Sequence, residues 1–113
     1  MKSHLIKASL MLAVTSILCS SAYAAVDAVA AKQLARKDSC LRCHAVAKKK
    51  EGPSYQAVAY KYKDNPEAQA ILFKHLTIGD KIKASDGTDQ IHKIAKAKND
   101  DDINNLISWI LAQ

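Results

Sequence analysis

The sequence predicts an all-α domain over residues 25–113, preceded by a secretory signal peptide over residues 1–24. Several segments repeat apolar residues at helical spacing, and capping residues or helix breakers bound these segments. No segment alternates apolar and polar residues for long enough to predict a sheet. We therefore expect helices at both ends of the domain and a long loop before the last one.

The first 24 residues have the parts of a signal peptide. Lys2 and Lys7 make the start basic, an apolar run follows, and Ala22-Tyr23-Ala24 fits the small-x-small cleavage pattern. The alternative is a membrane anchor, but a spanning helix needs about 20 apolar residues and this run is shorter. Cleavage would place residues 25–113 in the periplasm with no membrane anchor.

Cleavage also changes the residue inventory. It removes Lys2 and Lys7 and no acid, so the formal net charge falls from +6 to +4. Cys19 and both methionines lie in the leader, so the mature chain keeps only Cys40 and Cys43 and has no methionine. A single domain of this size buries a modest share of its surface. One close cysteine pair cannot join distant segments, so something else should fill the centre.

The first half of the domain contains two predicted helices. Residues 25–38 are alanine-rich with apolar side chains near helical spacing, and the motif CLRCH at 40–44 follows them. A charged stretch and Gly52-Pro53 interrupt the chain. A short helix is then expected from Ser54, because Pro53 suits the first turn of a helix.

The second half contains two more helices and the loop between them. Pro66 begins a helix that Gly79 ends. Residues 80–98 are polar and aperiodic, and we expect mostly loop with a short turn around 90–93. Asn99 and the three following aspartates cap the last helix. Its apolar face comprises Ile103, Leu106, Ile107, Ile110 and Leu111.

The motif at 40–44 has the Cys-x-x-Cys-His spacing of covalent haem attachment. Cys40 and Cys43 would form thioethers with the two vinyl groups, and His44 would be held under the iron as an axial ligand. One alternative is a redox dithiol, which favours a βαβ context that the sequence lacks. Another is zinc, for which the two cysteines and two of His44, His75 and His92 could supply four ligands, although without the usual spacings. We interpret the motif as the site of one haem c.

The chain resembles the small class I bacterial cytochromes c. The resemblance rests on CLRCH, on GPSYQAVAYKY at 52–62 and on NDDDINNLISWILAQ at 99–113, and it covers nearly the whole mature chain. It implies three to four helices around one covalent haem, with crossing N- and C-terminal helices and Trp109 in or near their contact. It also implies that the Pro53 carbonyl accepts the His44 ring N–H, and that residues 80–98 lie on the distal side of the haem.

The sequence departs from the family at the second axial ligand. The family normally has a methionine in the distal loop, and the mature chain has none. His92 lies at about that position, and a neutral imidazole binds haem iron well, so we predict His92 as the second ligand. The alternatives are His75, interpreted as a surface or half-buried helix residue, a deprotonated Lys93 or Lys96, or no ligand.

Two axial histidines would occupy both open positions of the iron, which favours electron transfer over catalysis. Replacement of methionine by histidine should also lower the reduction potential. We therefore expect a periplasmic monohaem electron carrier and not an enzyme. The alternative is a haem-based gas-binding or sensor protein with a labile or vacant sixth position, which would bind carbon monoxide readily when reduced.

Lysines predict the kind of partner. They follow the haem motif and recur through the distal loop, and they would attract acidic redox proteins such as multihaem cytochromes. An ordinary solvated lysine surface is the alternative interpretation. We expect a monomer that does not bind nucleic acid, since the chain has no recognisable module for it. The lysines are Lys48, Lys49, Lys50, Lys81, Lys83, Lys93, Lys96 and Lys98.

Overall fold

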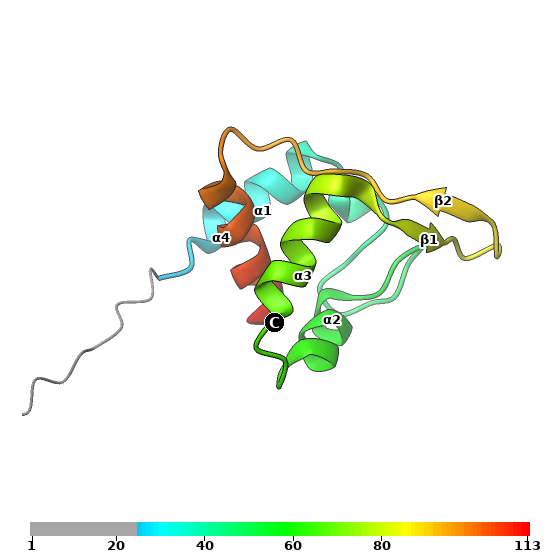
Figure 1. The fold of residues 1–113 in the computed structure, drawn as a ribbon, viewed down its shortest axis with the longest axis horizontal. Helices are drawn as coiled ribbons and strands as arrows, with labels where there is room; N and C mark the ends of the chain where they lie inside the picture. The colour runs from blue at the N-terminus through cyan, green and yellow to red at the C-terminus, as the bar shows by residue number, and fades with distance from the viewer. Residues whose placement is uncertain (1–24) are drawn as a thin grey trace, which may run out of the picture.

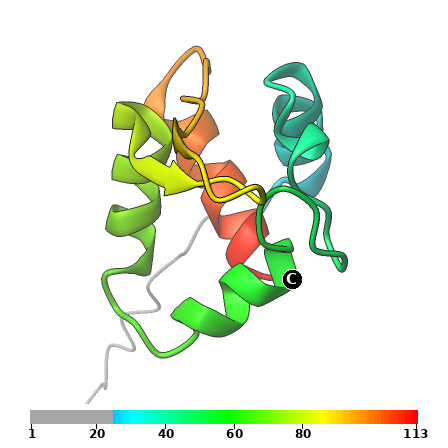
Figure 2. The ribbon, with the colours of Figure 1, turned by 90° about the vertical axis from the view of Figure 1, so that its right-hand side faces the viewer.

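The computed structural model describes residues 25–113 and contains four α-helices, the first three of which pack around the last (Figure 1). These helices are α1 (Ala28–Lys37), α2 (Tyr55–Tyr62), α3 (Ala68–Lys74) and α4 (Asp100–Leu111). Helix α4 contacts each of the other three, and a view turned by 90° places α1 and α3 on opposite sides of it (Figure 2). The predicted mostly helical fold is confirmed. The signal peptide predicted over residues 1–24 lies outside the described residues.

Local signals in the sequence explain the helix starts. The side chains of Asp27, Ser54 and Asn99 each accept a backbone N–H from the first turn of α1, α2 and α4, respectively. Three aspartates in the first turn of α4 also oppose the helix dipole. Helix α1 begins at Ala28 and not at residue 25, because its cap is Asp27.

The predicted contact between the first and last helices is present. Asn105 of α4 joins the start of α1 through two hydrogen bonds of 2.8 Å, one from the Asp27 N–H and one to the Asp27 carbonyl. Leu106 and Ile107 are almost completely buried beneath this contact. Trp109 is also buried, and its ring meets Tyr55 of α2 edge-on at 5.4 Å between ring centres. The core therefore extends from the α1–α4 contact to the start of α2.

The segment expected to be mostly loop contains a β-hairpin. Strands β1 (Lys81–Lys83) and β2 (Asp89–Ile91) pair antiparallel, with Lys81 opposite Ile91. Gly87 turns the chain with φ of +84°, and Asp86 accepts hydrogen bonds from the Thr88 backbone and hydroxyl. The expectation of a short turn around residues 90–93 was therefore wrong. The Asp-Gly pair in the sequence is a known hairpin signal, but the flanking strands are too short to show a period.

The third helix also ends differently from the prediction. After α3 the backbone widens into a π-helical segment, η2 (His75–Gly79). Gly79 ends it with φ of +79°, as the glycine stop predicted. Within the described residues, no helix is both long enough and apolar enough to cross a membrane.

Candidate functional site

The CLRCH motif forms a tight turn directly after α1. Ser39 adopts a left-handed conformation with φ of +61°, and a 3₁₀ turn, η1 (Cys40–Arg42), follows it. The N–H groups of Cys43 and His44 both donate to the Cys40 carbonyl. Cys40 is half-buried and Cys43 is exposed, and neither is in a disulfide. Both thiols and the imidazole therefore belong to one compact turn.

Burial raises the pKa of the Cys40 thiol, and the nearby Asp38 carboxylate adds to this effect. The thiol is therefore held in its protonated form. The positive charge of Lys93 acts in the opposite direction on the same thiol. The segment after β2 also comes close to the motif, because the ring centre of His92 lies 6.0 Å from that of His44. The tertiary fold thus brings the motif together with the chain segment that carries His92.

Three neighbours fix the imidazole of His44. Its Nδ1 lies 2.7 Å from the Pro53 carbonyl oxygen, the contact that the family resemblance implied. The Tyr55 ring stacks on it at 5.5 Å between ring centres. Gly52 passes so close that an added Cβ would lie 2.4 Å from His44 Cε1. Because Nδ1 faces Pro53, the other ring nitrogen, Nε2, remains available as a ligand.

His92 lies opposite His44. It follows β2 directly, and its ring centre is 6.0 Å from that of His44 with 50° between the ring planes. Burial, together with the neighbouring His75 and His44, lowers the pKa of His92 to about 4. The imidazole is therefore neutral near pH 7, which is the form that binds metals.

His75 also reaches this region. It is the first residue of η2, its side chain is 27% exposed, and its ring centre is 4.1 Å from that of His92. Its Nδ1 lies 2.9 Å from Asp80 Oδ2. The half-buried position agrees with the sequence-based interpretation, but the contacts with His92 and Asp80 were not foreseen. Lys93 and Lys96, the lysine alternatives, are exposed.

Two hydrogen bonds tie the distal segment to the helices. The buried carboxylate of Asp38, at the end of α1, accepts the Lys96 N–H at 2.6 Å. The Leu76 carbonyl of η2 accepts the Ala95 N–H at 2.8 Å. Sequence reasoning missed Asp38, because a single aspartate after a helix has no distinctive pattern. Gly52 was identified only as a chain breaker, although it directly precedes the proline that contacts His44.

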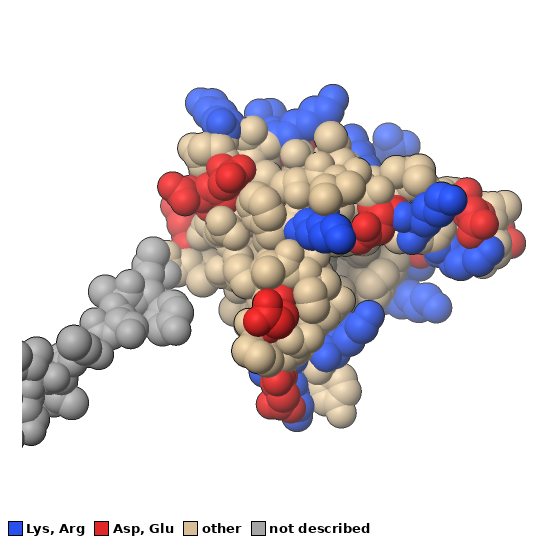
Figure 3. Space-filling view, in the orientation of Figure 1, with Lys and Arg blue, Asp and Glu red and all other residues tan. Residues whose placement is uncertain are grey.

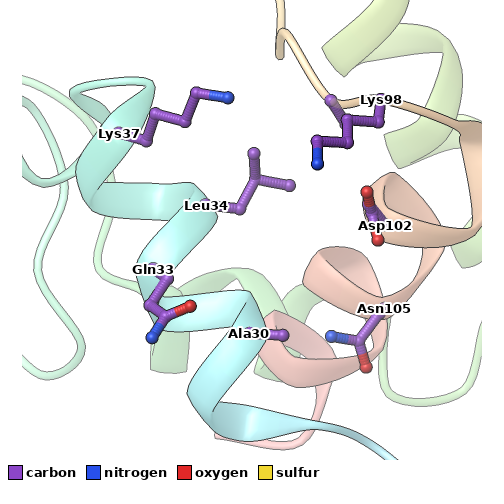
Figure 4. Close-up of a pocket in the computed structure, with 8 residues that line it drawn as sticks. Ala30, Gln33, Leu34, Lys37, Lys98, Asp102 and Asn105 are labelled. Atoms are coloured by element: carbon purple, nitrogen blue, oxygen red, sulfur yellow. The ribbon is translucent and has the colours of Figure 1, made fainter.

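The surface has one hollow beside this site and another between α1 and α4. A hollow of about 550 Å³ lies between the Gly52-Pro53 segment and the hairpin, where Ser85 donates a hydrogen bond to Glu51. A second, of about 380 Å³, lies between α1 and α4 and is lined in part by Leu34, Lys98 and Asn105 (Figure 4). None of the haem-motif residues lines the second hollow, and no group of three or more His, Cys, Asp or Glu side chains suited to a metal ion occurs in residues 25–113.

Comparisons with known proteins agree with this geometry. The family model for cytochrome c matches residues 28–113. Cytochrome c-551 of Pseudomonas aeruginosa is 31% identical over 104 residues, which cover 91% of each chain. The crystal structure of the class 1 cytochrome MtoD from Sideroxydans lithotrophicus ES-1 is similar with a TM-score of 0.72 and 46% identity, over 78% of this chain and 97% of that one. Cytochrome c552 of Nitrosomonas europaea gives a TM-score of 0.59 and 28% identity, over 72% and 96%.

Proposed function

The chain belongs to the cytochrome c family, and from this premise we propose that it is a bis-histidine electron carrier whose axial ligands are His44 and His92. As a member of this family it is a monohaem cytochrome c with covalently bound haem c, and it is an electron carrier and not an enzyme. The further proposal concerns the two ligands and the low reduction potential that they would give.

The separation of the two imidazoles is the observation that carries this proposal. Two imidazoles bound to opposite sides of one metal ion, with bonds of about 2 Å, have ring centres roughly 6 Å apart. The ring centres of His44 and His92 are 6.0 Å apart. The donor set also fits, because His44 keeps its Nε2 free and His92 is neutral. The mature chain has no methionine to compete for the distal position.

Each residue would have a distinct task. The Cys40 and Cys43 thiols would hold the cofactor in place as thioethers, next to His44 in the same turn. The Pro53 carbonyl would accept the His44 ring N–H, which orients the imidazole and makes it a stronger donor. Tyr55 would cover the side of His44 and exclude water from it. The bound haem supplies the one-electron chemistry.

The choice of His92 would set the redox range. Methionine ligation raises the potential of a haem, so an imidazole in its place should lower it relative to histidine–methionine relatives. The competing function is a gas-binding or sensor protein, in which His92 would leave the iron readily. The half-buried position of His92 and the two hydrogen bonds that hold its segment favour the carrier.

Carbon monoxide binding to the reduced holoprotein tests the proposal. We expect the wild type to be six-coordinate and low-spin and to bind carbon monoxide slowly. The His92→Ala variant should open the iron and bind the gas rapidly. Lys93→Ala, at the exposed neighbour, is the matched control and should behave like the wild type. Rapid binding by the wild type would support the sensor function, and a six-coordinate His92→Ala variant would remove His92 as the ligand.

We also propose that the distal face binds an acidic redox protein. Ile78 and Ile91 are 65% and 64% exposed, and Ile94 is 41% exposed, with Ile91 and Ile94 packed around Gly79. Exposed lysines lie on the same segments, with Lys81 opposite Ile91 in the hairpin, and basic side chains lie along the upper edge in Figure 3, over the segment after β2. An apolar centre with a charged rim is the usual composition of a protein interface.

The sign of the salt dependence tests this docking face. Oxidation of the reduced protein by ferricyanide, an anion, should slow as ionic strength rises, and oxidation by a cationic cobalt ammine complex should not. Replacement of Lys81 and Lys93 by glutamate should make the rate of oxidation by ferricyanide less sensitive to ionic strength. A salt dependence that is the same for both reagents would contradict the proposal.

The proposed location of the protein follows from residues 1–24. We propose that the protein is exported and works in the periplasm, because residues 1–24 have the pattern of a signal peptide. Mass spectrometry of the protein purified from the periplasm would test this, with Ala25 expected as its first residue.

A further inference from the structure

Three aromatic rings connect the proximal histidine with the last helix. The ring of Tyr55 stacks on the His44 imidazole, with 5.5 Å between ring centres and 19° between ring planes. The same tyrosine ring meets Trp109 edge-on, with 5.4 Å between ring centres and 75° between ring planes. These residues come from the motif turn, from α2 and from α4, so the row of rings links three separate parts of the fold.

The backbone holds Tyr55 in its position beside His44. Tyr55 is the first residue of α2, and its N–H donates to the Ala45 carbonyl at 2.9 Å. The next N–H, of Gln56, donates to the Val46 carbonyl at 3.0 Å. The start of α2 is therefore fixed to the two residues that follow His44 in the chain. The tyrosine ring cannot leave the imidazole unless these hydrogen bonds or the packing around the ring change.

Trp109 supports the Tyr55 ring from α4. The two side chains are 5% and 3% exposed, and an edge-to-face contact is a favourable arrangement of aromatic rings. Leu106 and Ile110 of the same helix are buried as well. Closely packed side chains in a core have little freedom to move. The position of the Tyr55 ring therefore depends on the packing of α4 against α2 (Figure 2).

The hydrogen bond with Pro53 does not by itself fix the plane of the His44 ring. The ring can turn about the line that joins its Nδ1 to the carbonyl oxygen, because a carbonyl accepts hydrogen bonds over a broad range of directions. Gly52 lies nearest to Cε1 and limits the turn at that atom. The stacked Tyr55 ring limits it over the face of the imidazole. The hydrogen bond thus fixes the direction of Nδ1, and the stacked ring fixes the plane.

We propose that Tyr55, supported by Trp109, is a positioning residue of the proximal ligand: it sets the plane of the His44 imidazole. This inference rests on the proposed ligation of the iron by His44 and His92. Groups around an axial histidine orient its ring and so tune the metal. The angle between the two axial ring planes governs the electron paramagnetic resonance (EPR) spectrum of a low-spin bis-histidine haem. The planes of His44 and His92 are 50° apart in the structure.

The EPR spectrum of the oxidised holoprotein tests the inference. Tyr55→Leu removes the stacked ring, so the His44 imidazole should adopt a range of planes, and the signal with the largest g value should shift and broaden. Tyr55→Phe keeps the ring and should restore the wild-type spectrum. Tyr60→Leu is the matched control and should leave the spectrum unchanged, because this tyrosine lies on the same helix but is 75% exposed. A wild-type spectrum for Tyr55→Leu would overturn the inference.

Substitution of Trp109 tests the part played by α4. Trp109→Leu removes the edge that meets the Tyr55 ring, so the largest g value should shift in the same direction as in Tyr55→Leu, by a smaller amount. Trp109→Phe keeps an aromatic edge and should give a spectrum close to that of the wild type. A wild-type spectrum for Trp109→Leu would show that the backbone alone holds Tyr55, and the support by Trp109 would be wrong.

A measurement on the wild type covers the case in which a variant does not fold. The reduced low-spin holoprotein is diamagnetic, so its proton NMR spectrum can be assigned. Nuclear Overhauser contacts should connect the ring protons of Tyr55 with those of His44 and of Trp109. Absence of the contact between Tyr55 and His44 would overturn the inference without any substitution.

The outcomes separate the inference from the proposed function. If His92→Ala opens the iron but Tyr55→Leu leaves the EPR spectrum unchanged, the carrier function stands and the role of Tyr55 is wrong. If the wild type is high-spin or binds carbon monoxide rapidly, the bis-histidine ligation is wrong, and the inference fails with it.

Discussion

The proximal and distal sides of the site hold their histidines in different ways. On the proximal side, His44, Gly52, Pro53 and Tyr55 lie within twelve residues of one another and make direct contacts with the imidazole ring. On the distal side, His92 is held through its backbone by Asp80, and its segment is tied by hydrogen bonds to α1 and η2. The proximal arrangement is local in sequence, whereas the distal one depends on contacts between remote elements.

This difference indicates which side is easier to open. The proximal imidazole has a short hydrogen bond, a stacked ring and a close backbone around it, so little can move without distorting the motif. The distal imidazole has a buried Nδ1 without a partner and lies after a two-stranded hairpin. Short hairpins of this kind are only marginally stable by themselves. Ligand exchange should therefore take place on the distal side.

The largest expected effect is that of Gly52→Ala. The added Cβ would lie 2.4 Å from His44 Cε1, so the ring must shift and its hydrogen bond with Pro53 must lengthen. Overpacking of this kind costs about 1–3 kcal/mol. We expect a low yield of low-spin holoprotein, measured by its absorption spectrum. Gly87→Ala is the control. Its site is open, and its left-handed backbone costs about 1–2 kcal/mol without changing the spectrum.

Asp38→Ala should produce the next largest effect, on the distal side. The substitution leaves the Lys96 N–H without its acceptor in a partly buried position, which costs about 1–3 kcal/mol of unfolding free energy. It also frees the segment that carries His92, so carbon monoxide should bind faster. Denaturant unfolding and gas-binding kinetics would measure both changes. Asp38→Asn keeps an acceptor oxygen, so its stability and its rate of carbon monoxide binding should lie between those of the wild type and of Asp38→Ala. Equal losses of stability in both variants would contradict this role of Asp38.

Asn99→Ala should produce the smallest effect and leave both sides intact. Loss of the cap of α4 costs about 1 kcal/mol, since the Asn99 side chain accepts the Asp102 N–H at 2.9 Å. Thermal unfolding of the holoprotein would detect this loss. The absorption spectrum and the rate of carbon monoxide binding should stay unchanged. A faster gas reaction in this variant would show that distal access follows global stability and not the local ties of Asp38.

The sequence predicted the helical elements well, because their signals are local. Asp27 was not identified as the cap of α1, but the helix itself was, and the cap at Asn99 and the stop at Gly79 agree with the structure. The hairpin was missed, because three-residue strands cannot show a two-residue period. The π-helical segment was missed as well, since no residue pattern distinguishes it from a continuing α-helix.

The sequence by itself determined the covalent haem motif and the family, because thioether attachment requires two cysteines and a histidine at one spacing in a single turn. It also showed that residues 25–113 contain no methionine for the distal position. Only the tertiary structure decided that the ring centre of His92 lies 6.0 Å from that of His44, and that His75 and Asp80 lie beside His92. The physical reason is that these residues come from separate elements, which meet only when the helices pack around α4 and the hairpin turns the chain back toward the motif.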